Sequence, residues 1–287
     1  MRYIVAFILF VSTLCAFNFE ISNSTIKNGR TAMILFDKEE GVAYDKLLVG
    51  KRSYKIFNHP LNNEKMYALL PVSYYKKPTT EKVKVAYSKA TKDLSKTLFF
   101  KIEDGKYQKE HIKVQKSKVN PKSEAVKKRT AKEYAQAMKI YGTVTPKNYV
   151  KSKYIVPMDS KITSSFGKAR VYNDTLKGYH SGTDFRAKIG TPIVASNRGK
   201  VVLAQDRFYA GNSVIIDHGE GIYTCYYHLS EFKVKEGDMV EKAQVIGLSG
   251  DTGRITGPHL HFSVRVGGLQ VDPLQLIALL NANLYKL

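Results

Sequence analysis

The stretch Gly257-Pro258-His259-Leu260-His261-Phe262-Ser263-Val264-Arg265-Val266 decides how the second half of this chain folds. Polar and apolar residues alternate along it, and successive side chains of a β-strand point to opposite faces of a sheet. One face therefore carries apolar residues for a core, while the other presents the imidazoles of His259 and His261 side by side. Two adjacent imidazoles outside a core indicate metal binding or proton transfer, although a chance polar face gives the same alternation.

The surrounding sequence has the same strand-like character. Short apolar or alternating runs, separated by glycine-rich corners, occupy residues 192–195, 200–204, 213–217 and 223–228. Runs of this length and spacing predict a compact antiparallel β domain over residues 154–287.

The first half of the chain contains a second set of short runs, with turn residues such as Asn28-Gly29 and Asp104-Gly105 between them. This spacing predicts a β-sandwich-like domain over residues 17–114.

After the front domain, the apolar residues recur at the spacing of a helix. Asn120 is a predicted N-cap, Pro121 fits the first turn and Gly142 closes the helix, so residues 115–153 are expected to be a basic helical linker. The predicted fold class is therefore mainly β.

The first 16 residues have the pattern of a signal peptide. Arg2 is followed by an almost unbroken apolar run from Ile4 to Leu14, and Ala16 is the small residue expected before a cleavage site. This run is shorter than the roughly 20 apolar residues of a membrane span. The alternatives are a buried N-terminal strand and a lipoprotein, which the bulky Leu14 before Cys15 disfavours. We expect export to the periplasm, with membrane association as a further possibility.

Composition narrows the classes of function. The chain has 46 Lys and Arg against 25 Asp and Glu, a net charge of +21. Residues 17–153 carry +17 of this charge, and they either form a solvated surface or dock on an anionic envelope surface. No nucleic-acid-binding motif occurs. Only Cys15 and Cys225 are present, which excludes a disulfide framework, a four-cysteine zinc site and an iron–sulfur cluster.

Further metal-ligating residues lie upstream of the two imidazoles. His180 and Asp184 are four residues apart around Gly182, which argues against a helix and allows a loop to bring both groups to one point. His228 ends the predicted strand at 223–228. A hydrolytic zinc centre takes three protein ligands and leaves one position for water, and two histidines with one aspartate meet that requirement. Because the chain has no His-Glu-x-x-His helix, a spare imidazole must accept the proton.

Several short motifs occur in a fixed order between Lys161 and Pro273. They are Ser165-Phe166-Gly167, His180-x-Gly182-x-Asp184, Asp217-His218-Gly219, Tyr227-His228-Leu229, Gly250-x-Thr252-Gly253 and Gly257-Pro258-His259-Leu260-His261. In this order they resemble the lysostaphin/LytM-type zinc endopeptidases of bacterial cell walls. The resemblance implies a LytM-type catalytic domain with one Zn²⁺ held by His180, Asp184 and His261. It also implies that His228 and His259 are the catalytic pair and that His218 is structural.

By the same resemblance, the expected substrates are the peptide stems and cross-links of peptidoglycan. Gram-negative relatives commonly cut D-alanyl-diaminopimelate cross-links as D,D-endopeptidases, and some also act as D,D-carboxypeptidases, in cell wall remodelling that sets cell shape. We expect a monomer. Its glycine-rich loops at 247–257 and 173–178 are expected to form the walls of the groove that binds the peptide substrate. The front half resembles more loosely a module that precedes this domain in Gram-negative relatives, where an N-terminal segment can cover the groove in a latent form. The alternatives are a non-hydrolytic LytM-type activator or binding protein, and a lipoyl-carrier-like domain, whose Met-Lys-Met turn is absent.

Overall fold

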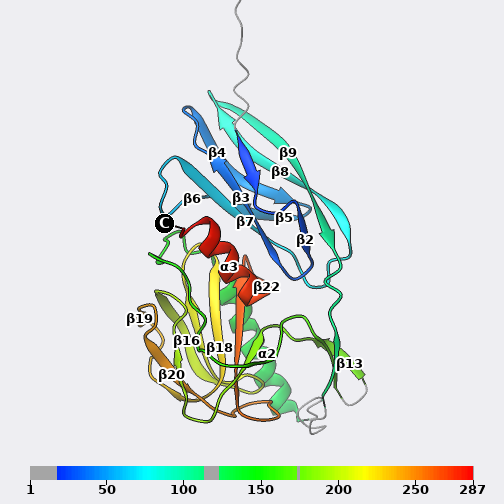
Figure 1. Ribbon diagram of the computed structural model, residues 1–287, viewed down its shortest axis with the longest axis vertical. Helices are drawn as coiled ribbons and strands as arrows, with labels where there is room; N and C mark the ends of the chain where they lie inside the picture. The colour runs from blue at the N-terminus through cyan, green and yellow to red at the C-terminus, as the bar shows by residue number, and fades with distance from the viewer. Residues whose placement is uncertain (1–17, 113–122, 173–174, 287) are drawn as a thin grey trace, which may run out of the picture.

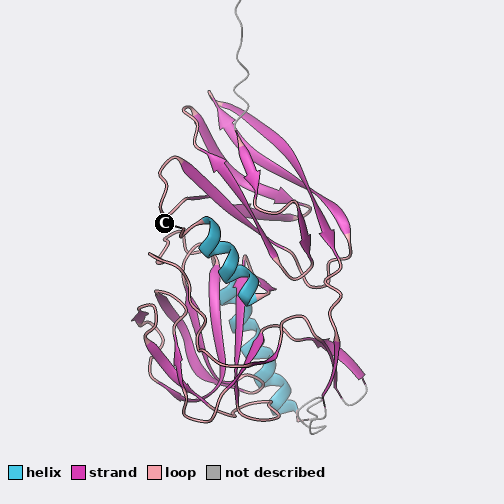
Figure 2. Cartoon of the chain, viewed as in Figure 1, coloured by secondary structure: helices cyan, strands magenta, loops and turns pink. Residues whose placement is uncertain are grey.

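The computed structural model describes residues 18–112, 123–172 and 175–286. Two β-rich bodies lie one above the other along the long axis of the molecule, the front body at the top and the second body below (Figure 1). Strands dominate both, and the helices lie within or beside the second body (Figure 2). The mainly β fold class is therefore confirmed. The predicted signal peptide lies outside the described residues.

The front body is a sandwich of two sheets. One sheet has four strands in the order β1 (Phe19–Ile21), β3 (Thr31–Asp37), β7 (Lys65–Pro71) and β6 (Phe57–Asn58). The other has five, in the order β2 (Thr25–Lys27), β9 (Lys92–Glu103), β8 (Thr79–Lys89), β4 (Val42–Val49) and β5 (Arg52–Lys55). The two sheets enclose one apolar core between them.

Alternation along the strands explains which face of each sheet is buried. In β8, Val83 and Val85 are fully buried, whereas Lys82 and Lys84 are exposed. Since neighbouring residues of a strand face opposite ways, the valine face of β8 packs into the core and the lysine face is exposed to solvent.

The second body is built on a large antiparallel sheet. Its main path runs β11 (Ile162–Ser164), β14 (Thr183–Arg186), β21 (His259–Val266), β18 (Ile222–Phe232), β17 (Gly211–Asp217), β16 (Gly199–Arg207) and β19 (Met239–Val240). Three further strands join it, namely β15 (Pro192–Val194), β20 (Val245–Ser249) and β22 (Leu269–Val271). The apolar side chains of β21, from Leu260 to Val266, are at most 2% exposed and lie in the core. The opposite face of β21 is left for the histidines.

A small three-stranded sheet joins the two halves of the chain. It consists of β10 (Lys109–Ile112), β12 (Ala169–Tyr172) and β13 (Thr175–Tyr179). The sequence predicted a strand near residues 112–114 within the front domain. In the structure, β10 instead pairs in parallel with β12 of the second body, because the chain has already crossed between the bodies at this point.

The linker helix α2 (Glu124–Gly142) ends where the sequence predicted. It begins later than expected, with Ser123 at the N-cap and no side-chain capping hydrogen bond, while Asn120 and Pro121 lie outside the described residues. Besides linking the two bodies, the helix packs against the large sheet. Its buried Tyr141 packs edge-on against Tyr223 of β18, so α2 covers part of the face of the large sheet that carries the histidines.

The C-terminal helix α3 (Pro273–Asn283) joins the two bodies. The Asp272 side chain accepts hydrogen bonds from the backbone N–H groups of the first turn, as an N-cap does. The Gln275 side chain then pairs with both backbone groups of Thr31 in β3, at 2.9 Å each. None of the helices in the described residues is long and apolar enough to cross a membrane.

Candidate metal centre

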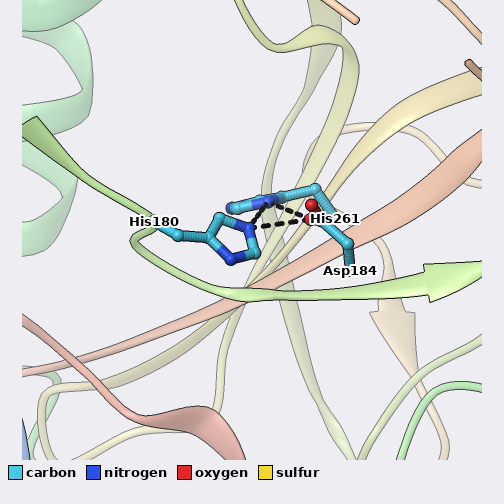
Figure 3. Close-up of side chains that lie close together, drawn as sticks. All are labelled: His180, Asp184 and His261. Atoms are coloured by element: carbon cyan, nitrogen blue, oxygen red, sulfur yellow. Dashed lines mark hydrogen bonds and ion pairs between the residues drawn. The ribbon is translucent and has the colours of Figure 1, made fainter. Parts of the chain in front are cut away.

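His180, Asp184 and His261 meet at one point in the second body (Figure 3). His180 stands just before β14, Asp184 lies in β14, and His261 lies directly opposite Asp184 in β21. The Oδ1 atom of Asp184 is 2.9 Å from His180 Nε2 and 2.7 Å from His261 Nδ1. The two imidazole nitrogens are 3.0 Å apart. The structure thus brings together two nitrogens and one oxygen that the sequence separates by about eighty positions.

Buried neighbours fix the orientation of these side chains. His180 is fully buried, and its Nδ1 lies 2.8 Å from the carbonyl oxygen of Ser165. A carbonyl can only accept a hydrogen bond, so Nδ1 carries a hydrogen and Nε2 is the nitrogen that faces the other two side chains. His261 fits because Gly182 has no side chain, since a Cβ there would lie 2.7 Å from His261 Nε2.

This arrangement fits a metal ion. Without a hydrogen on Nε2, His180 and the Asp184 carboxylate oxygen are both hydrogen-bond acceptors, yet they face each other at 2.9 Å. A proton or a metal ion is therefore needed between them. Two imidazoles and one carboxylate, all less than 10% exposed, are a donor set that suits zinc and leaves a fourth position open.

The charge states of the cluster are consistent with metal ligation. Burial raises the pKa of the Asp184 carboxyl, but contacts with His261 and His180 outweigh burial and hold this pKa well below its usual range. Burial lowers the pKa of His261 to about 4, although Asp184 opposes the change. A carboxylate and a neutral imidazole are the forms that bind a metal.

His228 and His259 lie beside the cluster. Their ring centroids are 5.1 Å apart, and His259 Nε2 is 3.6 Å from Asp184 Oδ1. Each ring donates its Nδ1 hydrogen to a backbone carbonyl at 2.8 Å, that of Thr252 for His228 and that of Gly257 for His259. These bonds leave Nε2 of both rings available as a proton acceptor. Burial lowers the pKa of His228 to about 3, so this imidazole is neutral at neutral pH.

His228 owes its position to an unusual backbone conformation. Its neighbour Tyr227 pairs with His261 across the sheet and stacks against the His261 ring, so regular alternation would point His228 to the opposite face. Its φ of 64° falls instead in the left-handed region, which non-glycine residues rarely adopt. Strain of this kind is typical of functional sites, and here it accompanies a shift in the pairing register of β17 with β18.

His218 stands apart from the cluster. It is buried, donates from Nδ1 to the carbonyl of Arg198 at 2.8 Å and accepts at Nε2 from Thr224 at 2.7 Å. Burial lowers its pKa to about 4. With both ring nitrogens occupied, His218 joins two strands and has no nitrogen left for a metal.

The sequence did not identify the residues that support the cluster. Arg170 approaches Asp184 Oδ2 at 3.2 Å, and Ser165 acts through its backbone. A contact through a backbone carbonyl cannot be predicted from residue type. The role of Arg170 depends on which residues lie next to it in the folded protein. The loop at 247–257 supplies the carbonyls that hold His228 and His259, whereas the loop at 173–178 falls partly outside the described residues.

Comparison with known proteins identifies the family to which the region around the metal cluster belongs. Residues 178–273 match the model of Peptidase family M23. The chain is 47% identical over 122 residues to the peptidoglycan DD-endopeptidase ShyA of Vibrio cholerae, a match that covers 42% of this chain and 28% of ShyA. It is 43% identical over 97 residues to the DD-carboxypeptidase/endopeptidase Mpg of Neisseria meningitidis, covering 34% of this chain and 22% of Mpg.

A solved structure resembles a larger part of the chain. It is described as a candidate peptidase M23 from Pseudomonas aeruginosa, and it shares 27% sequence identity at a TM-score of 0.65. The likeness covers 86% of this chain and 93% of that one, so it includes the front body as well as the second. The curated relatives, in contrast, are matched over only about a quarter of their length.

Proposed function

We propose that this chain, whose residues 178–273 form a Peptidase family M23 domain, is a zinc-dependent hydrolase of peptidoglycan cross-links. The observation that carries the proposal is the convergence of His180, Asp184 and His261, with the two further imidazoles of His228 and His259 beside them. Three ligands with an open position and a neighbouring base are what metal-assisted peptide hydrolysis requires.

The residues of the site have separate roles in the proposed hydrolysis. When bound, Zn²⁺ supplies Lewis acidity for hydrolysis at neutral pH. His180, Asp184 and His261 hold the ion; contacts with the two histidines keep Asp184 ionised, and burial keeps His261 neutral, as ligation requires. Nε2 of His228 or His259 accepts the proton of the attacking water. The other imidazole stabilises the negative charge that develops on the scissile carbonyl oxygen, and the accepted proton then passes to the leaving amine.

The proposed bond is the D-alanyl-diaminopimelate cross-link, with release of a terminal D-alanine as a second reaction. Support comes from the two kinds of relative, a DD-endopeptidase and a DD-carboxypeptidase/endopeptidase. We also propose that the first 16 residues direct export and that the protein works in the periplasm, where it remodels the wall and influences cell shape. Comparing the N-terminus of the mature protein with the cut after Ala16, together with cell fractionation, tests this localisation.

Digestion of purified sacculi tests the hydrolytic activity. The wild-type protein, a chelated sample and His259→Ala are incubated with sacculi, and the soluble muropeptides are identified by mass spectrometry. We expect the wild type to convert cross-linked dimers to monomers and the other two samples to leave them intact. Equal profiles in all three samples would reject hydrolysis and favour the activator alternative. A defined pentapeptide stem, assayed for free D-alanine, tests the carboxypeptidase reaction separately.

A further inference from the structure

The two oxygens of the Asp184 carboxylate face different partners. Oδ1 faces the nitrogens of His180 and His261, where the metal would bind. Oδ2 lies 3.2 Å from Nη2 of Arg170, which donates a hydrogen bond to it. Arg170 therefore restrains the rotation of this carboxylate from the side away from the two imidazoles. Contacts of this type orient the ligands of a metal and affect how tightly it binds.

Arg170 in turn forms an ion pair with Glu110. Glu110 Oε2 is 3.6 Å from Arg170 Nε, and Oε1 is 3.2 Å from Lys168 Nζ. The hydroxyl of Ser164 donates to the same carboxylate at 3.0 Å, and this hydroxyl lies 3.2 Å from His180 Nδ1. Glu110 thus touches two residues that each contact a member of the metal cluster.

Glu110 belongs to the strand that follows the front body, not to the second body. In the parallel pairing of β10 with β12, Glu110 lies directly opposite Arg170. The same segment is fastened to the front body, because the Tyr107 hydroxyl donates to the carbonyl of Asn28 at 2.6 Å. Strand register and the front body together place this carboxylate next to the metal cluster.

Partial burial strengthens the electrostatic contacts of Glu110. The side chains of Glu110, Lys168 and Arg170 are between 20% and 26% exposed, and that of Asp184 is 7% exposed. Two carboxylates and two cations balance one another at this place. Loss of the Glu110 charge would leave two cations beside a site for a divalent cation, and it would also remove one ion-pair contact of Arg170. Both effects weaken metal binding.

We propose that Glu110 is a positioning residue of the metal centre, which acts through Arg170 on Asp184 and makes metal affinity depend on the strand between the two bodies. The inference rests on the proposed zinc site. It requires no assumption about the substrate.

Zinc affinity of the full-length protein tests the proposal. Competition with a chromophoric chelator is measured for the wild type and for Glu110→Gln. We expect the variant to bind zinc about 10- to 100-fold more weakly, the usual effect of losing a group that orients a ligand. The absorption spectrum of the Co²⁺-loaded variant should also shift, since the Asp184 carboxylate is no longer held in one orientation. The unfolding temperature of the metal-free protein serves as the control for folding.

Two further variants separate positioning from general effects. Lys168→Met removes a partner of the same carboxylate that has no contact with Asp184, and it should leave zinc affinity at or above the wild-type value. Glu110→Gln combined with Arg170→Gln should weaken binding by less than the sum of the two single effects, because part of the effect of Glu110 passes through Arg170. Unchanged zinc affinity and an unchanged Co²⁺ spectrum in Glu110→Gln would overturn the proposal, as would additive effects of the two substitutions. If the sacculi assay fails while these results hold, the proposed hydrolysis of peptidoglycan is wrong and the role of Glu110 at the metal centre stands.

Discussion

A buried glutamate between the two bodies should make the stability of the protein depend on pH. Glu220, in the turn between β17 and β18, is 8% exposed. Its carboxylate accepts hydrogen bonds from the Tyr67 hydroxyl of the front body and from Asn148 Nδ2, the latter at 2.8 Å. No ion pair to Glu220 occurs in the described part of the chain. Burial raises its pKa from 4.5 to about 7, although the bonds from Tyr67 and Asn148 oppose the change.

The sign of the effect follows from linkage. The folded protein retains a proton on Glu220 between pH 4.5 and pH 7, whereas the unfolded chain has lost it. The protonated carboxyl therefore contributes stability below pH 4.5, and this contribution disappears as the pH rises through 7. Between pH 5 and pH 8 the free energy of unfolding should fall by about 2.5 kcal/mol from this group alone. Glu220→Gln has no such proton and should lack this part of the pH dependence.

Urea unfolding of both proteins at pH 5 and pH 8 measures this difference. Near-ultraviolet circular dichroism can follow the 19 tyrosines, because the chain has no tryptophan. The matched control is Glu241→Gln, since Glu241 is 69% exposed and paired with Arg198, so the variant should differ from wild type by less than about 1 kcal/mol at either pH. If wild type and Glu220→Gln lose the same stability between pH 5 and pH 8, Glu220 is not protonated in the folded protein at pH 5 and the reasoning fails.

Three other predictions concern the metal centre and the contact between the bodies. Gly182→Ala places a Cβ 2.7 Å from His261 Nε2, and we expect zinc affinity in chelator competition to fall by about tenfold or more; an unaltered affinity would contradict this. Asp272→Ala removes the N-cap of α3 and should lower the free energy of unfolding in urea by about 1 kcal/mol. Zinc at 1,000 times its dissociation constant should stabilise the metal-free protein by about 4 kcal/mol, and calorimetry in which zinc leaves the transition temperature unchanged would argue against a zinc site.

The sequence by itself determined the fold class and predicted the members of the candidate site. Period-two alternation in 257–266 predicted both the buried face of β21 and the histidine face opposite it, and the structure agrees with both. His180 and Asp184 were added through the ordered motifs that resemble the lysostaphin/LytM-type family, because a His-x-x-x-Asp pair by itself is equally consistent with a surface turn. The end of α2 at Gly142 was also predictable from a local signal, since helix ends depend on nearby residues.

Tertiary structure alone decided how these groups are oriented and what couples them to the front body. The left-handed backbone of His228 follows from the pairing around it, and the hydrogen bond that sets the His180 tautomer comes from a backbone carbonyl. The ordinary acidic residues Glu110 and Glu220 acquire their roles from partners far along the chain, Arg170 and Tyr67. Such contacts depend on strand register and on how the two bodies pack. A local pattern of residue types records neither of these, because the interacting groups become neighbours only after folding.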